Sequence, residues 1–216
     1  MKRIIAPSFL ASNFLKLASE VDMVNESVAE WLHLDIMDGR FVPNISFGLP
    51  VVEQIAAVTD KFCDVHLMIV EPEKYINDFK NAGADQITVH IEACPHLHRV
   101  LEQIHDLGMK AGIAVNPHTP IDFLKDIIQH ADVVNLMSVN PGFGGQKFIE
   151  HTYLKIGELR RLINERSLDT LIQIDGGVTA DNAAKLFDTG VNVLVAGSSV
   201  FKAADPKGAI AELLNA

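Results

Sequence analysis

Four residues in this chain combine the side-chain types of a metal site with those of an acid–base pair. His33 and Asp35 occur in WLHLDIMDG, His66 in CDVHLMIVEP and Asp175 in LIQIDGGV, each at or near the end of a short apolar run. Two imidazoles and two carboxylates form a nitrogen and oxygen ligand set that suits a borderline divalent ion such as zinc. The carboxylates of Asp35 and Asp175 could also carry protons. Together the four residues predict proton-transfer chemistry assisted by a metal ion.

The spacing of His33 and Asp35 places both side chains on the same side of a strand. Taken alone, this pair is equally consistent with a hydrogen-bonded pair in the core, because buried polar clusters are often structural. His66 and Asp175, at matching positions on other strands, favour the metal site. His90 and Glu92 repeat the spacing and are either unrelated to the site or partners of its ligands. The other histidines are expected mostly on the surface: His96, His98, His105, His118, His130 and His151.

Positioning these residues requires a regular framework, and short apolar runs alternate with longer amphipathic stretches along the whole chain. The expected strands are Arg3–Pro7, Trp31–Ile36, Phe62–Met68, Gln86–Ile91, Lys110–Val115, Val133–Met137, Leu171–Ile174 and Val193–Ala196. The expected helices include Asn13–Ala29, Pro72–Ala82, His96–Leu107, Tyr153–Glu165, Ala180–Phe187 and Pro206–Leu214. Eight β/α alternations in 216 residues predict an α/β fold, a single (β/α)8 TIM barrel spanning residues 1–216 as one catalytic domain.

The main alternative to a barrel is an open, doubly wound sheet. That fold usually has a glycine-rich turn after its first strand, and Pro7-Ser8-Phe9-Leu10 is not such a turn. In a barrel, the loops that follow the strands form the active site. Groups that bind a ligand are therefore expected in those loops.

The loops after the last two expected strands are rich in small residues. Gly176, Gly177 and Gly197 allow backbone N–H groups to approach an anion closely, and Ser198 adds a hydroxyl donor. In many barrels these two loops hold a phosphate group. The alternative is that these turns need glycine only because they are tight.

A third segment, NPGFGGQ at residues 140–146, follows the sixth expected strand. Gly142, Phe143, Gly144 and Gly145 form a loop with many free amides, which could close over a bound substrate. The alternative is a flexible surface loop. Three methionines, Met37, Met68 and Met137, could form an apolar cap that excludes water from an intermediate, although ordinary core filling accounts for them equally well.

Composition and missing motifs exclude several classes of protein. The formal net charge of −10 argues against a nucleic-acid-binding surface. No apolar run reaches the ~20 residues of a membrane span, and the N-terminal apolar stretch is too short for a signal peptide. The two cysteines form no disulfide framework, which fits a reducing, cytoplasmic location. No lysine lies at the C-terminal end of an expected strand, which disfavours a Schiff-base aldolase.

The chain resembles the ribulose-phosphate 3-epimerase family from end to end. The matching segments are IIAPSFLASNF, HLDIMDGRFVPNISFG, DVHLMI, VNPGFGGQKF, IQIDGGV and AGSSVF, in the correct order. The resemblance implies a TIM barrel that interconverts D-ribulose 5-phosphate and D-xylulose 5-phosphate by inversion at C3 through an enediolate. It implies one divalent ion per subunit, most often zinc, with iron, manganese and cobalt among relatives. It also implies a homo-oligomer, either a dimer or a hexamer.

The same resemblance assigns roles to individual residues. It implies that His33, Asp35, His66 and Asp175 bind the metal, with Asp35 as proton acceptor and Asp175 as proton donor. It implies substrate contacts at these positions: Ser8, His66, Gly142, Phe143, Gly144, Gly145, Asp175, Gly176, Gly177, Gly197 and Ser198. No departure from the family pattern occurs at these residues.

Three alternative functions use the same framework. A C3 epimerase of a hexulose 6-phosphate, such as D-allulose 6-phosphate, would use the same four ligands. Related barrel decarboxylases and hexulose-phosphate synthases carry an Asp-x-Lys-x-x-Asp motif, whereas Met37 and Arg40 occupy the Lys and final Asp positions here. A non-catalytic metal- or phosphate-binding barrel is the third, since fold alone does not determine function.

Overall fold

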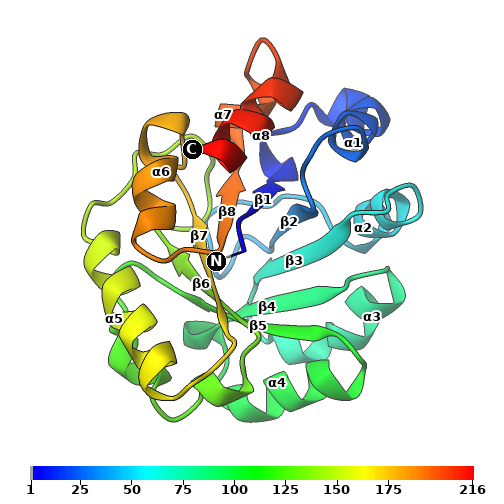
Figure 1. Cartoon of the computed structure of the whole chain (residues 1–216). Helices are drawn as coiled ribbons and strands as arrows, with labels where there is room; N and C mark the ends of the chain where they lie inside the picture. The colour runs from blue at the N-terminus through cyan, green and yellow to red at the C-terminus, as the bar shows by residue number, and fades with distance from the viewer. Residues whose placement is uncertain (1) are drawn as a thin grey trace.

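The computed structural model describes residues 2–216, and a ring of parallel strands surrounded by helices forms its centre (Figure 1). The eight strands are β1 (Ile4–Pro7), β2 (Trp31–Met37), β3 (Phe62–Met68), β4 (Gln86–His90), β5 (Lys110–Val115), β6 (Val133–Met137), β7 (Leu171–Asp175) and β8 (Val193–Ala196). They lie side by side in the order β1-β8-β7-β6-β5-β4-β3-β2. A parallel bridge between Ser8 and His33 joins the two ends of this order. The fold is the predicted TIM barrel.

The strand predictions are confirmed to within one residue at every end. β1 begins at Ile4 instead of Arg3, and β2 continues to Met37. β4 ends at His90, and β7 includes Asp175. The agreement is close because parallel strands covered on both faces read as continuous apolar runs, which turn residues interrupt sharply.

The helices agree less well with the sequence prediction. They are α1 (Leu17–Asn25), α2 (Leu49–Ala56), α3 (Ile76–Asn81), α4 (Leu97–Asp106), α5 (Thr152–Glu165), α6 (Ala180–Asp188), α7 (Ser198–Phe201) and α8 (Pro206–Asn215). The helix expected over Asn13–Ala29 is wrong at both ends. The Asn13 side chain accepts a hydrogen bond from the Leu15 amide and starts a 3₁₀ turn at Phe14–Lys16 instead.

Two further segments differ from the expected helices. The stretch expected as Pro72–Ala82 divides into a 3₁₀ turn, Pro72–Lys74, followed by α3. The fifth β/α unit has no α-helix: its strand is followed by the 3₁₀ turns Ile121–Leu124 and Ile128–His130. Ile121, Leu124 and Ile128 are nevertheless buried, so these turns cover the barrel as a helix would.

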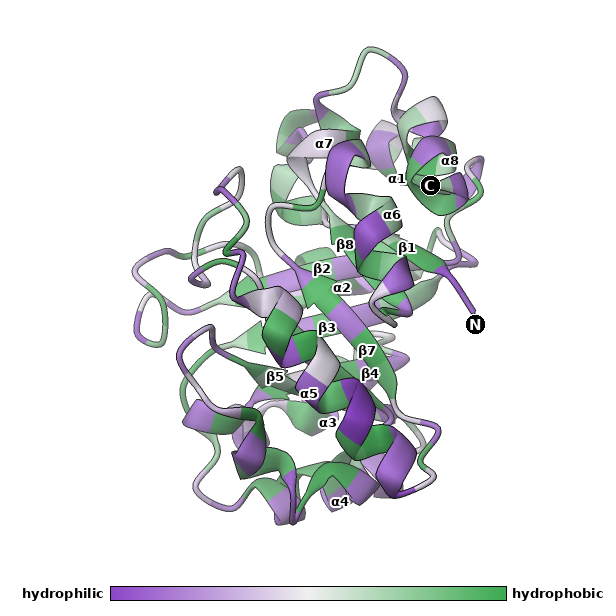
Figure 2. Ribbon diagram, turned by 60° about the vertical axis from the view of Figure 1, so that its left-hand side comes forward, coloured by the Kyte–Doolittle hydropathy of each residue, from purple (hydrophilic) through white to green (hydrophobic). Residues whose placement is uncertain are grey.

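The inside of the barrel consists of a polar layer between two apolar ones. Four members of an apolar cluster, Ile4, Trp31, Val133 and Val193, are the first residues of their strands, and Ala6 and Val195 complete it further along β1 and β8. Above it lie buried polar residues, among them His33, Asp35, Asp64, His66, Gln86 and Gln173. A third layer at the strand ends comprises Met37, Val42 and Met68. In Figure 2 the strand ribbons are correspondingly green with purple bands. The polar layer is therefore shielded from water at the strand starts.

Between residues 2 and 216, no helix is both long and apolar enough to cross a membrane.

Candidate metal and substrate site

The four predicted ligands converge on one point in the polar layer. The converging atoms are Nε2 of His33, Oδ1 of Asp35, Nδ1 of His66 and Oδ2 of Asp175. The two histidines are fully buried, and Asp35 is 3% exposed. They come from β2, β3 and β7, so the sheet brings together residues up to 142 positions apart (33 to 175). The sequence prediction that these side chains form one group is confirmed.

The separations between these atoms fit a divalent ion. Oδ1 of Asp35 lies 3.2 Å from the His33 nitrogen and 3.1 Å from the His66 nitrogen. Oδ2 of Asp175 lies 3.7 Å and 3.4 Å from the same two nitrogens. Tetrahedral ligands at ~2.0 Å from a zinc ion would be roughly 3.3 Å apart. The site can therefore hold such an ion without large movements of the side chains.

The charges of the cluster also call for a cation. Burial opposes ionisation of Asp35, but the charges and hydrogen bonds of His33 and His66 hold its pKa below the usual range. The pKa of Asp175 is lowered too, although burial and the charge of Asp35 oppose this. Burial lowers the pKa of each histidine, but the surrounding carboxylates raise both pKa values overall. A divalent cation would supply the positive charge that protonated imidazoles otherwise supply.

A buried carboxylate fixes the orientation of the first histidine. Nδ1 of His33 lies 2.7 Å from Oδ2 of Asp64, and that carboxylate also accepts hydrogen bonds of 2.7 Å from Gln86 and Gln173. Nδ1 therefore carries a proton, and Nε2 is left to face the cluster. Sequence reasoning missed Asp64, Gln86 and Gln173. A signal for Asp64 was present, because it precedes His66 by two residues, as His33 precedes Asp35.

A second chain of contacts fixes His66. Its Nε2 lies 2.9 Å from Nε2 of His90, whose Nδ1 lies 3.2 Å from Oε2 of Glu92. If Nδ1 of His66 binds a metal, its Nε2 donates to His90, and His90 in turn donates to Glu92. Burial lowers the pKa of His90 to about 4, which keeps that ring neutral. Of the two interpretations of the His90 and Glu92 pair, the structure supports the one in which they are partners of a ligand.

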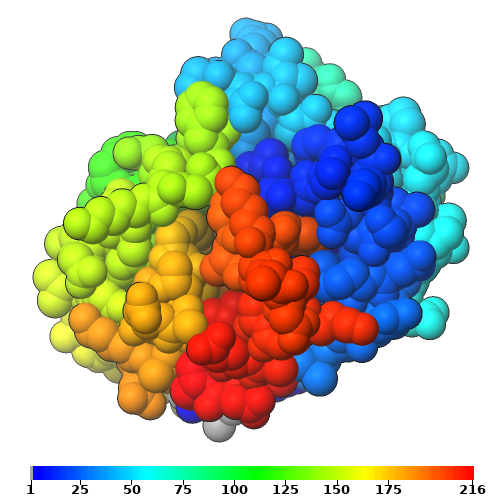
Figure 3. All heavy atoms as spheres, turned by 90° about the horizontal axis from the view of Figure 1, so that it is seen from above, coloured from blue at the N-terminus to red at the C-terminus, as the bar shows by residue number. Residues whose placement is uncertain are grey.

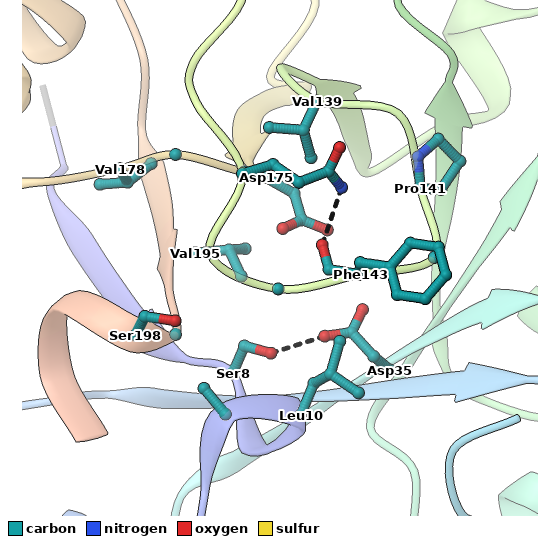
Figure 4. A pocket seen from close by; sticks show the side chains of 18 of the residues that line it. Ser8, Leu10, Asp35, Val139, Pro141, Phe143, Asp175, Val178, Val195 and Ser198 are labelled. Carbon is teal, nitrogen blue, oxygen red and sulfur yellow. Dashed lines mark hydrogen bonds between the residues drawn. The ribbon is translucent and has the colours of Figure 1, made fainter. Parts of the chain in front are cut away.

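A pocket of about 300 Å³ opens above the cluster at the C-terminal ends of the strands. The predicted residues that line it are Ser8, Asp35, Met37, Met68, Met137, Gly142, Phe143, Gly144, Gly145, Asp175, Gly176, Gly177, Gly197 and Ser198. In Figure 4 the carboxylates of Asp35 and Asp175 point into the same space from two sides, and Ser8 donates a 2.6 Å hydrogen bond to Oδ2 of Asp35. His66 is fully buried and lies outside this lining.

The loop at residues 140–146 forms one wall of the pocket. Asn44, in the segment after β2, donates a 2.8 Å hydrogen bond to the Gly142 carbonyl. Figure 3 shows the two segments side by side, the loop in yellow-green and the segment after β2 in light blue. Gln146 donates to the carbonyls of Asn140 and Phe143. Phe143 itself is 53% exposed. The loop therefore has defined internal contacts while it carries an exposed ring at the pocket entrance.

Two glycines in the loop after β7 have backbone conformations that other residues adopt with strain. Gly176 has φ 115° and Gly177 has φ 65°. A Cβ at Gly177 would lie 2.6 Å from the backbone nitrogen of Phe148, and one at Gly176 would overlap the side chain of Val139. These positions require glycine for close packing, and their backbone lines the pocket.

Comparison with known proteins places this arrangement in a family. A sequence model described as the ribulose-phosphate 3 epimerase family matches residues 4–201, a range that includes every residue of the cluster. The chain belongs to the ribulose-phosphate 3-epimerase family. The resemblance seen in its sequence segments is thereby confirmed.

Individual members of the ribulose-phosphate 3-epimerase family are close to this chain over nearly its whole length. The ribulose-phosphate 3-epimerase of Synechocystis sp. is 51% identical over 98% of this chain and 93% of its own length. That of Bacillus subtilis is 48% identical over 97% of both chains. A solved 3-hexulose-6-phosphate synthase has a TM-score of 0.69 at 20% identity, over 100% of this chain and 99% of its own. The last similarity shows the fold alone.

Proposed function

We propose that this chain is a metal-dependent epimerase that interconverts D-ribulose 5-phosphate and D-xylulose 5-phosphate by inversion at C3. The observation that carries the proposal is the placement of Asp35 and Asp175, from strands that are not neighbours, on one pocket and one buried ligand cluster. Family membership supplies the substrate, because the named relatives act on ribulose phosphate.

The two carboxylates would act as the acid–base pair. Inversion at a carbon next to a carbonyl requires one group to remove a proton and another to return it from the opposite face. Asp35 enters the pocket from β2 and Asp175 from β7 (Figure 4). We assign Asp35 as the acceptor and Asp175 as the donor, with the roles exchanged in the reverse direction. Ser8 orients Asp35 through the 2.6 Å hydrogen bond to Oδ2.

The metal ligands would be His33, Asp35, His66 and Asp175. When bound, a divalent ion, zinc or alternatively ferrous iron, manganese or cobalt, would supply positive charge to the oxygen atoms of the substrate. Asp64 and His90 hold the two imidazoles in the tautomers that binding requires. The nitrogen and oxygen ligand set does not select among these ions.

The rest of the pocket would bind the sugar phosphate and exclude water. The backbone amides of Gly176, Gly177 and Gly197, with the Ser198 hydroxyl, suit the phosphate, because small residues leave their N–H groups accessible. Met37, Met68 and Met137 line the inner part of the pocket and are buried. Their polarizable side chains would cover the planar intermediate and keep water away from it. The loop at residues 140–146 would close the entrance.

The proposal is tested by removing the metal and restoring it. We expect chelator-treated protein to lose turnover of D-ribulose 5-phosphate, and zinc, manganese, cobalt or ferrous iron to restore it. D-allulose 6-phosphate, assayed in parallel, tests the hexose alternative: preference for it would keep the mechanism and change the substrate. Absence of turnover of either sugar in folded, metal-loaded protein would refute the epimerase proposal and favour a binding protein.

We also infer that the chain works as a homo-oligomer with one divalent ion in each barrel site. Apolar side chains are exposed near the segment after β2: Leu15 is 97% exposed and Ile45 is 74% exposed. Phe14, half exposed, packs edge-on against Phe47 in the same region. Apolar surface of this kind is typical of protein–protein contacts. Light scattering during size-exclusion chromatography would measure the number of subunits.

A further inference from the structure

A second group of metal-ligating side chains lies on the outside of the barrel, between α4 and the 3₁₀ turn Ile128–His130. It consists of His98 and Glu102 on α4 and His130 at the end of the turn. One ligand atom from each residue lies within 4.8 Å of the other two. Nδ1 of His130 is 3.2 Å from Oε1 of Glu102, and the ring centroids of His98 and His130 are 4.5 Å apart.

The backbone positions of all three residues are fixed by the core. His98 and Glu102 are four residues apart and share the outward face of α4. The opposite face of that helix is buried through Val100, Leu101 and Ile104. Ile128 anchors the turn that carries His130 and is fully buried. The three side chains are thus brought together by rigid elements, so that ordering them around an ion costs little backbone freedom.

The side-chain types define the kind of ion. Two imidazole nitrogens and one carboxylate oxygen suit borderline ions such as zinc, nickel and cupric copper, whereas calcium and magnesium prefer all-oxygen sites. A zinc ion usually takes four ligands, so three protein ligands leave at least one position open. Water can fill that position, because His98 and Glu102 are exposed. The hydrogen bond in this group joins His130 to Glu102, and the nitrogens of His98 are available to complete the ligand set.

We propose that His98, Glu102 and His130 form a second divalent-metal site, separate from the four-ligand cluster inside the barrel. None of the three lines the substrate pocket. An ion bound there links α4 to the segment that leads into β6. It binds the folded chain only, since the three residues are adjacent only when the barrel is formed, and it therefore stabilises the fold without taking part in turnover.

The test counts metal sites in the full-length protein. Chelator-treated protein is titrated with zinc by calorimetry. We expect two zinc sites per chain in the wild type. The weaker site should be absent from the double variant His98→Gln/His130→Gln. The matched control is His151→Ala, which removes an exposed histidine elsewhere. The double variant and the His151→Ala control should both keep wild-type turnover. At a hundredfold excess over Kd of the weaker site, zinc should raise the Tm of the wild type roughly 5–10 °C more than that of the double variant.

Cupric copper gives a readout that does not depend on activity or stability. With the barrel site already filled with zinc, copper added to the wild type should give an electron paramagnetic resonance spectrum with coupling to two nitrogens, and Glu102→Gln should change that spectrum. A single zinc site in the wild type, or two sites retained in the double variant, would overturn the proposal.

Discussion

Nδ1 of His33 and Oδ2 of Asp64 lie 2.7 Å apart in a fully buried part of the barrel. The pair determines which nitrogen of His33 faces the four-ligand cluster, because an imidazole that donates from Nδ1 has its lone pair on Nε2. Asp64 therefore controls the ligand set without touching an ion itself.

Asp64→Asn should weaken metal binding while the barrel remains folded. The amide can still contact Gln86 and Gln173, but it no longer selects the Nδ1–H tautomer of His33. Loss of such a partner typically costs roughly 10–100-fold in metal affinity. Competition with a chelating dye would measure the affinity. Asp60→Asn, an exposed aspartate just before β3, is the matched control and should bind as the wild type does.

His90→Ala should also weaken metal binding, since it removes the group that accepts the Nε2 proton of His66. His90→Gln should restore part of the affinity, because its carbonyl oxygen can accept the same proton. The d–d absorption spectrum of cobalt-substituted protein would report the ligand geometry directly. Equal affinities for both variants and the wild type would show that His90 only fills space.

Asp175→Asn and Asp35→Asn should each reduce epimerisation by roughly 10²- to 10⁴-fold, the usual contribution of a positioned acid or base. The remaining carboxylate should still exchange the C3 proton of one epimer with solvent. In deuterium oxide, mass spectrometry should therefore detect label in the epimer whose proton the intact carboxylate removes, with little inversion. Asp181→Asn, on the surface of α6, is the control, and the metal content of every variant must be measured.

Acid stability should depend on Glu92. Burial raises its pKa, but hydrogen bonds from His90, Thr119 and the amide of Asn116 outweigh burial and lower the pKa to about 2. A lowered folded-state pKa stabilises the protein above the usual glutamate pKa, ~4.3, and this stability is lost as the pH falls toward 2. Urea unfolding at pH 7 and pH 3 should show a smaller difference for Glu92→Gln than for the wild type.

Gly177→Ala should destabilise the protein by about 2–4 kcal/mol, through its positive φ and the close approach to the backbone of Phe148. Gly144→Ala is the matched control, because a Cβ there meets no atom within 4 Å. It should change the free energy of unfolding by less than ~1 kcal/mol. Urea denaturation of both variants would measure the two values. Similar losses at the two positions would contradict the packing argument.

The sequence predicts the strands and the ligands better than the helices, for physical reasons. His33, Asp35 and His66 interrupt apolar runs at the spacing of a strand, and a polar residue inside a buried run is costly unless it is paired or binds a ligand. The start of α1 is mispredicted because the 3₁₀ turn at Phe14–Lys16 depends on a local hydrogen bond to the Asn13 side chain. Such local contacts leave no periodic signal.

The partners of the ligands could not be predicted because they depend on strand register. Gln86 and Gln173 come from two different strands, β4 and β7. Their role follows only from the hydrogen bonds that both donate to the Asp64 carboxylate. Nothing in the sequence distinguishes His98 and His130 from the other surface histidines. Their proximity results from the packing of the Ile128–His130 turn against α4.

The parallel bridge between Ser8 and His33 is where the ring of strands meets itself, and it joins the residue that orients Asp35 to a residue of the ligand cluster. If the bridge between β1 and β2 is open, all the other pairs of neighbouring strands can still form, but the pocket is not assembled. Metal affinity should therefore report whether the ring of strands is closed. Stalled or misassembled chains with native-like helix content should be recognisable as those that fail to retain the ion.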